Sequence, residues 1–155
     1  MEDPGPAAVT SIDRDECLRL LAADTIGRLA VVVGRAPVIL PVNYFLDGGV
    51  VVFRSDPGMK VDYGLRGPVA FEIDEFDRRD HTGWSVVVSG RLEEPAPFNN
   101  RAQEQIRSLP VHPWAAGEKA HWLRLVPSRI TGRRLAHRGT ATRGNAGASD
   151  AGADT

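Results

Sequence analysis

The sequence predicts a mainly β fold with few helices, of the antiparallel barrel or sandwich type. From Ile26 onward the chain consists of short runs rich in β-branched residues, which are typical of strands. Turn-forming residues separate these runs at spacings that suit neighbouring antiparallel strands. At Asp47-Gly48-Gly49, for example, the residues tolerate the positive φ of a tight hairpin turn. Helical spacing is confined to three segments.

The first expected element is a helix over Arg14 to Ala23. Asp13 stands before it as an N-cap, with Glu16 three residues later at the spacing of a capping box. The segment before this helix is rich in proline and glycine, and we expect residues 1–12 to form a flexible lead.

The strands follow, interrupted by one short helix over about Pro57 to Leu65 and by a second, amphipathic helix from Pro97 to Leu109. The expected strands are Gly27–Val33, Val38–Phe45, Val50–Phe53, Val69–Ile73, Trp84–Leu92 and, last, His121–Leu135. Pro127 indicates that the last strand is an edge strand or is broken there. Residues 13–135 thus form the domain. Residues 136–155 lack apolar periodicity and are expected to be a disordered tail, whose basic beginning either contacts anions or is simply solvated.

The composition limits the partners and the cellular compartment that the protein can have. The 155 residues are 42% hydrophobic and 25% charged, with a formal net charge of -1, so no overall field would attract nucleic acid or an anionic membrane. The single Cys17 excludes an intramolecular disulfide and fits a reducing compartment. The N-terminal residues lack a signal-peptide pattern and no apolar run is long enough to cross a membrane, which favours a cytoplasmic location.

Several enzyme classes lose support because their motifs are absent. The four histidines show no zinc-binding spacing, so we expect no metal site. The sequence also lacks a GxSxG elbow, a Walker loop and a GxGxxG after a strand. Glu72 and Asp74 share one face of a strand, and a solvated strand face explains them better than acid/base catalysis.

A phosphate site is a candidate function for the segment after the Val50–Phe53 strand. Arg54 and Ser55 end this strand, and the helix that follows brings Lys60 one turn in. Two cations, a hydroxyl and the free amides of a helix start would suit a phosphate, although Asp56 at the helix start opposes an anion. Ordinary solvated charges are the alternative interpretation.

Tryptophan supplies a second hint. Trp84, Trp114 and Trp122 all stand near polar residues, a combination that suits either the edge of a core or a planar ring ligand.

Five features in order resemble the pyridoxamine 5'-phosphate oxidase-like superfamily of flavin-binding split barrels, in particular the small bacterial group that includes nitroimidazole-resistance-type proteins and many actinobacterial members. They are the N-terminal helix, GRLAVVVGRAPVILPVNYFLDGGVVVFRSDPGMK, VAFEIDEFD, TGWSVVVSGRLEE and WLRLVPSRITGRRL. The resemblance implies a six-stranded antiparallel split β-barrel of the FMN-binding type. It also implies a homodimer with two FMN sites at the subunit interface.

The resemblance further implies which residues bind the cofactor. It places Pro41, Val42, Asn43 and Tyr44 beside the isoalloxazine. It places Phe53, Arg54, Ser55 and Lys60 at the ribityl chain and phosphate. Trp84 and Ser85 would approach the cofactor from a neighbouring strand, and Trp122 and Arg124 from the partner subunit. His112 and Trp114 would line the substrate side.

The implied function is an FMN-dependent oxidoreductase that transfers hydride or electrons between the flavin and an unidentified small molecule. Two alternatives remain: a reductase that uses a deazaflavin cofactor, and a non-catalytic protein that binds flavin or haem. Oxidation of pyridoxamine phosphate itself is not expected, because the chain lacks a recognisable Arg and His set for that substrate after the closing strand.

Overall fold

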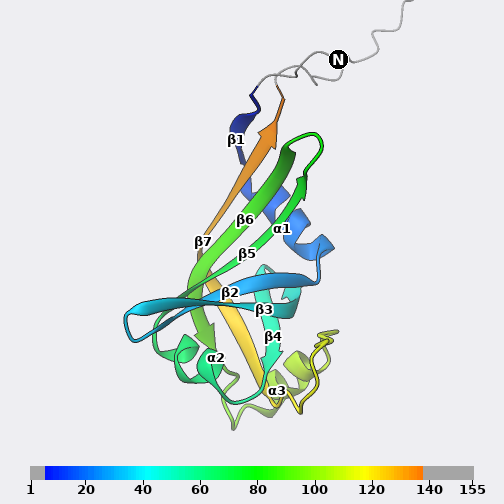
Figure 1. The fold of residues 1–155 in the computed structure, drawn as a ribbon. Helices are drawn as coiled ribbons and strands as arrows, with labels where there is room; N and C mark the ends of the chain where they lie inside the picture. The colour runs from blue at the N-terminus through cyan, green and yellow to red at the C-terminus, as the bar shows by residue number, and fades with distance from the viewer. Residues whose placement is uncertain (1–5, 138–155) are drawn as a thin grey trace, which may run out of the picture.

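Six antiparallel strands close into a ring in the computed structural model, which describes residues 6–137 (Figure 1). The sheet order is β1-β7-β4-β3-β2-β5-β6, and β6 pairs back onto β7 to close the barrel, with β1 outside the ring. The six-stranded antiparallel split barrel is therefore confirmed. The strands are β1 Ala8–Ile12, β2 Ile26–Val33, β3 Ala36–Asp47, β4 Val50–Ser55, β5 Pro68–Asp77, β6 Thr82–Glu93 and β7 His121–Ala136.

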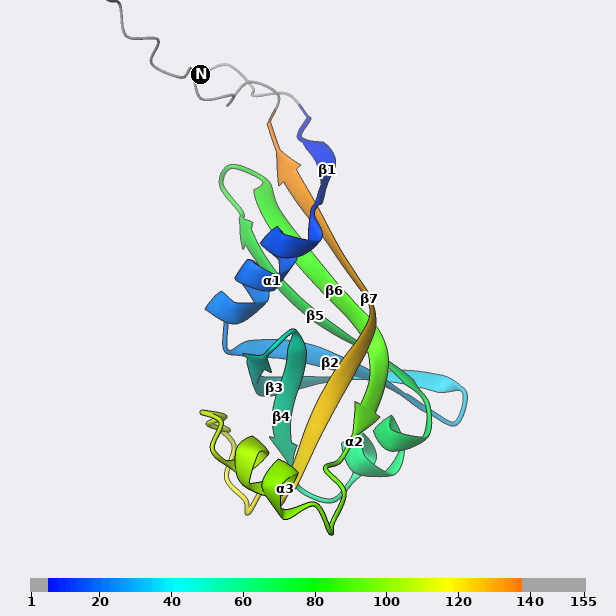
Figure 2. The same cartoon turned by 180° about the vertical axis from the view of Figure 1, so that it is seen from behind.

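The first helix, α1 (Arg14–Ala23), has the predicted bounds. Its start is capped as expected, since the backbone N–H of Glu16 donates to the Asp13 carboxylate at 2.9 Å. Cys17 and Leu21 are fully buried on the face that packs against the sheet. Figure 2 shows α1 beside the upper part of β6 and β7, where it closes one side of the barrel core.

The N-terminal lead differs from the prediction. Ala8–Ile12 is a strand that pairs with β7 from Ala8 opposite Ala136 to Ile12 opposite Gly132. The cause is the length of β7, which extends beyond β4 and leaves a backbone edge free for pairing. The expectation of a flexible lead is therefore wrong for residues 8–12. Residues 1–5 and 138–155, which cover the rest of the lead and most of the predicted tail, lie outside the described residues.

Turn chemistry determines the β3–β4 hairpin. Gly48 and Gly49 have φ of 55° and 84°, as the sequence predicted. Pro127 also disturbs β7 as predicted, because the register with β6 shifts between Ser89 and Gly90, beside the residue that opposes Pro127. At Pro127 one side of β7 is also a free edge within residues 6–137, as predicted, since β4 pairs with β7 only up to Leu125 and β1 only from Gly132. The strand as a whole is not an edge strand, because it pairs with β6 along most of its length.

The remaining helices are shorter than predicted. The segment over 57–65 forms only a four-residue helix, α2 (Met59–Asp62), and a 3-10 turn, η1 (Gly64–Arg66). The helix α3 (Asn100–Arg107) begins after Pro97 with Asn99 as its N-cap, whose side chain accepts from Ala102 N at 3.1 Å. Phe98 thus lies outside the helix and is 96% exposed.

Two apolar clusters result, one on each face of the strands β3, β4 and β7. The main core fills the barrel and includes Phe53, Phe71 and Leu123, which are fully buried. The second cluster lies on the outer face, where Val52 meets Ile106 of α3. The chain that follows α3 therefore runs over the outer face of β3, β4 and β7. None of the helices within residues 6–137 has both the length and the apolar character that a membrane crossing requires.

Candidate functional site

Strand alternation divides the predicted cofactor residues into two sets. The side chains of Val42, Tyr44 and Phe53 point into the barrel core, where each is 5% exposed or less. The Tyr44 hydroxyl donates to the Leu21 carbonyl at 2.6 Å, and the ring packs edge-on against Phe71. Burial raises the pKa of Tyr44 above its ordinary value. These three side chains hold the barrel together.

The other set lies on the outer face. Arg54 on β4 is paired with Trp122 on β7, and its guanidinium carbon is 4.9 Å from the centroid of the Trp122 ring. Arg124 follows two residues later on the same face, opposite Val52. On β3, Pro41 and Asn43 alternate with buried Val42 and so face outward as well. The structure therefore brings Pro41, Asn43, Arg54, Trp122 and Arg124 to one face of three adjacent strands.

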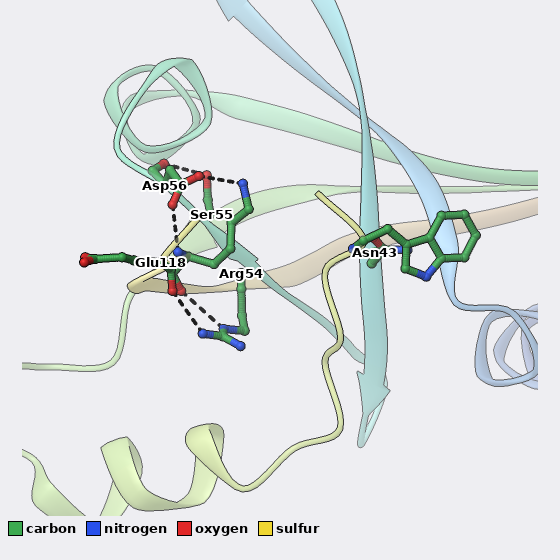
Figure 3. A network of polar contacts seen from close by, with 7 residues as sticks. Asn43, Arg54, Ser55, Asp56 and Glu118 are labelled. Atoms are coloured by element: carbon green, nitrogen blue, oxygen red, sulfur yellow. Dashed lines mark hydrogen bonds and ion pairs between the residues drawn. The ribbon is translucent and has the colours of Figure 1, made fainter. Parts of the chain in front are cut away.

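A loop covers part of this face, and we name residues 111–120 the covering loop. Its Trp114 N–H donates to Asn43 Oδ1 at 2.9 Å. Arg54 donates from Nε to the Lys119 carbonyl and from Nη2 to the Glu118 carbonyl, each at 3.2 Å (Figure 3). Two predicted cofactor residues thus hold the covering loop, and these two hydrogen bonds of Arg54 go to neutral carbonyls.

Asp56 ties the same loop from the other side. Its carboxylate accepts from Lys119 N at 2.7 Å and lies 2.5 Å from Lys119 Nζ. Hydrogen bonding to Lys119 keeps the pKa of Asp56 below its ordinary value. The pKa of Lys60 is also lowered, first by burial and then by the charge of Lys119, while Asp56 acts in the opposite direction. Lys60, Lys119 and Asp56 therefore form one electrostatic cluster beside Arg54.

The helix part of the phosphate prediction is wrong. A helix of four residues offers no developed dipole, so α2 cannot provide the helix start that the sequence indicated. Ser55 is 3% exposed, and its hydroxyl donates to the Asp56 carbonyl at 2.7 Å. An anion at this site would therefore be attracted by the lysine and arginine side chains and not by a helix dipole. Asp56 would repel an anion, but its charge is neutralised by the ion pair with Lys119.

Trp84 and Ser85 lie far from the outer face that carries Asn43 and Arg54. They are at the start of β6, which Figure 1 places at the opposite end of the barrel from the end of β4 and the start of β7. Trp84 packs against the core and borders a pocket of about 280 Å³, whereas Ser85 alternates to the other face. Within one chain, therefore, these two residues do not meet Asn43 or Arg54.

Sequence reasoning missed Lys119, although its rarity was a usable signal. Lys60 and Lys119 are the only lysines in the chain, and folding brings both to Asp56. The covering loop also carries His112 and Trp114, both exposed, with Trp114 74% exposed. Beside Trp114, the buried Nδ2 of Asn43 has no hydrogen-bond partner among residues 6–137. In the same described part of the chain, no group of three or more His, Cys, Asp or Glu is placed to hold a metal.

Known proteins resemble this chain in sequence and in fold. The family model described as pyridoxamine 5'-phosphate oxidase matches residues 13–134. An uncharacterised protein of Mycobacterium tuberculosis is 36% identical over 133 residues, which cover 82% of this chain and 86% of that protein.

Two solved structures extend the comparison. The FAD binding protein from Mycobacterium smegmatis is 31% identical, with a TM-score of 0.65 over 81% of this chain and 99% of that one. A Bacteroides thetaiotaomicron protein described as a candidate 5-nitroimidazole antibiotic resistance protein is 12% identical, with a TM-score of 0.64 over 84% of this chain and 90% of that one, and shares the fold alone. On these grounds the chain belongs to the pyridoxamine 5'-phosphate oxidase-like family of split-barrel proteins.

Proposed function

We propose that this protein is a flavin-dependent oxidoreductase, with FMN as its cofactor. The observation that carries the proposal is the outer face of β3 and β4. There the Asn43 amide has a donor without a partner among residues 6–137, and Arg54 on the neighbouring strand holds the loop that carries Lys119. Lys60, on α2, shares the electrostatic environment of Lys119. The FAD binding protein from M. smegmatis, at 31% identity, supports a flavin as the class of cofactor.

Asn43 suits the ring of a flavin. Its Oδ1 already accepts from Trp114 N, whereas its buried Nδ2 lacks an acceptor among the described residues. A buried donor without a partner costs about 1–3 kcal/mol, so an acceptor supplied by a ligand would be favourable. The isoalloxazine carries carbonyl and ring-nitrogen acceptors of this kind. The exposed indole of Trp114 offers a surface on which a planar ring can stack.

Lys60 suits the phosphate of the cofactor. It is half-buried, and within residues 6–137 it makes no salt bridge within 4.0 Å. Burial and the neighbouring Lys119 destabilise its charged form, which is the effect that a bound anion would reverse. Phosphate oxygens would form charge-assisted hydrogen bonds with it.

Redox chemistry at this site comes from the cofactor. A bound flavin supplies hydride or electron transfer, and the protein supplies position and electrostatics. Asn43 would orient the ring and Lys60 would hold the phosphate. Trp114 and Trp122 would limit the access of water along the outer face.

We further propose a homodimer in which each subunit completes the site of the other. The outer surface of β2, β3 and β5 carries exposed apolar residues, among them Ile39 at 67% exposure and Phe76 at 52%. Between them Arg28 forms an ion pair cluster with Glu72 and Asp74, with N–O distances of 2.7 and 2.5 Å. Apolar side chains around charged groups that pair with one another suit contact with a second copy. A partner would also explain why Trp84 is remote from Asn43 within one chain.

Ile39→Asp is expected to convert the dimer to a monomer, because a carboxylate would be desolvated at the interface. The molar mass in light scattering should fall from two chains to one. Phe98→Asp is the matched control, since Phe98 is 96% exposed in the segment before α3 and outside the strands β2, β3 and β5, and this variant should remain dimeric. A wild-type protein that is monomeric at all accessible concentrations would refute the interface.

Titration of the purified protein with FMN, FAD, the deazaflavin cofactor and haem, followed by absorbance, tests the function. We expect saturable flavin binding with a shifted visible band, and bleaching of that band when a nicotinamide donor is added under anaerobic conditions. Binding of the deazaflavin alone would favour a deazaflavin-dependent reductase. A flavin or haem that binds but is never reduced would favour a non-catalytic binding protein.

A further inference from the structure

We propose that Lys119 binds the phosphate of the cofactor together with Lys60, and that Arg54 acts as the residue that positions Lys119. This inference rests on the proposed flavin function and deepens it. It changes the role of Arg54, which the sequence placed directly on the phosphate, and it gives the covering loop a function in cofactor binding.

The backbone of Lys119 is held from both sides. Its N–H donates to Asp56 Oδ1 at 2.7 Å, and its carbonyl accepts from Arg54 Nε at 3.2 Å. The residue has φ of 48°, in the left-handed region that a lysine rarely adopts. Such a conformation persists where surrounding contacts impose it. Arg54 and Asp56 therefore select the position of the Lys119 peptide against its local preference.

Gly117 allows this arrangement. Its φ is 129°, and a Cβ at this position would overlap the Asp56 carboxylate. A glycine here lets the covering loop pass close enough for Lys119 to reach Asp56. The loop is thus built to deliver one specific side chain, and the side chain of Lys119 is only 15% exposed.

Charge at the cluster is unbalanced. Arg54, Lys60 and Lys119 carry three positive charges, whereas Asp56 supplies one negative charge. Glu118 does not compensate for the excess, because its side chain points away from Arg54 in Figure 3 and only its carbonyl is engaged. Two positive charges remain, and this excess matches the charge of roughly −1.5 to −2 that a phosphate monoester carries at pH 7.

Both lysines lie near the Asp56 carboxylate. Lys119 contacts it at 2.5 Å, and Lys60 follows Asp56 by four residues, on α2. The charge of Lys119 lowers the pKa of Lys60, and an anion bound between like charges relieves such repulsion. In the ligand-free chain the Asp56 carboxylate supplies part of the negative charge near the lysines. A bound phosphate would supply the rest, and Lys119 would contact both the phosphate and Asp56.

A phosphate-specific measurement separates this role from a purely structural one. The dissociation constants of FMN and riboflavin, which differ only by the phosphate, are compared for each variant by quenching of flavin fluorescence. For Lys119→Ala we expect a loss of at least about fivefold in FMN affinity with riboflavin affinity unchanged. Lys119→Arg should retain most of the preference for FMN. Arg78→Ala, which removes an exposed cation in the β5–β6 turn, is the control and should leave both constants unchanged.

The outcomes distinguish this inference from the proposed function. Equal losses for FMN and riboflavin, or an unchanged FMN-to-riboflavin ratio in Lys119→Ala, would overturn the role of Lys119 while leaving flavin binding intact. Failure of the wild-type protein to bind FMN, FAD or riboflavin would overturn both. Should Lys119→Ala fail to fold, competition of inorganic phosphate with FMN in the wild type and in Lys119→Gln supplies the same comparison, and equal competition in the two would overturn the assignment.

Discussion

Replacing Phe71 with alanine is expected to lower the free energy of unfolding by about 3–5 kcal/mol, the usual cost of removing a buried phenyl ring. Phe71 is fully buried on β5 between its strand neighbours Leu29 and Val88. Its ring packs edge-on against Tyr44 with the centroids 4.8 Å apart. The ring also fills the space that Gly27 leaves on β2, where a Cβ would overlap it. No neighbouring backbone can therefore close the cavity easily.

Denaturant unfolding followed by circular dichroism measures this loss. Small domains have a total stability of about 5–15 kcal/mol, so a loss of this size removes a large share of it and lowers the thermal unfolding midpoint markedly. The matched control is Phe98→Ala, which removes the same ring from a site that is 96% exposed and should change stability by less than about 0.5 kcal/mol. Equal stability of the two variants would contradict the assignment of Phe71 to the barrel core.

Replacing Lys60 with alanine is expected to weaken FMN binding by about 10- to 100-fold, in line with a charge-assisted hydrogen bond worth about 1.5–3 kcal/mol. The barrel should remain folded, because Lys60 stands on the short helix α2 outside the main core. Relief of the repulsion between Lys60 and Lys119 could only add to stability. We therefore expect the variant to lose affinity for FMN without losing its folded structure.

Isothermal titration of FMN and riboflavin into the wild type, Lys60→Ala and Lys60→Arg checks this expectation. Riboflavin affinity should not change in either variant, and Lys60→Arg should recover part of the FMN affinity, since it retains the charge with a different geometry. An FMN affinity in Lys60→Ala equal to that of the wild type would remove Lys60 from the phosphate site. The thermal unfolding midpoint of the ligand-free variants provides the folding control.

The barrel core and the proposed site use opposite faces of the strands β3 and β4. Alternation places Tyr44 and Phe53 inside the barrel against Phe71, and it places Asn43 and Arg54 outside under the covering loop. The core therefore holds the strands at the spacing that the outer residues need. For this reason the sequence motif around PVNY contains both residues of the scaffold and residues of the proposed site.

Local chemistry was sufficient for most of the elements. The Asp13 cap, the Gly48-Gly49 turn and the β-branched runs predicted α1, the β3–β4 hairpin and the strands, because each depends on residues close in sequence. Alternation alone could also have separated Tyr44 from Asn43. The predicted helix over 57–65 was too long. Its start signals do not fix where the helix ends, and in the structure α2 ends at Asp62, before the 3-10 turn η1.

Contacts between distant residues were decided only by the tertiary structure. The edge of β7 that receives Ala8–Ile12 exists because β7 extends beyond β4, and no local signal in residues 8–12 reports this. Asp56 and Lys119 are 63 residues apart and meet only when the covering loop crosses β4. By itself, then, the sequence determined the family, the strands along the chain and Lys60 as a cation near Arg54. The closed barrel determined the order of the strands in the sheet and brought Lys119 to Asp56, because these contacts depend on strand pairing and loop geometry rather than on spacing along the chain.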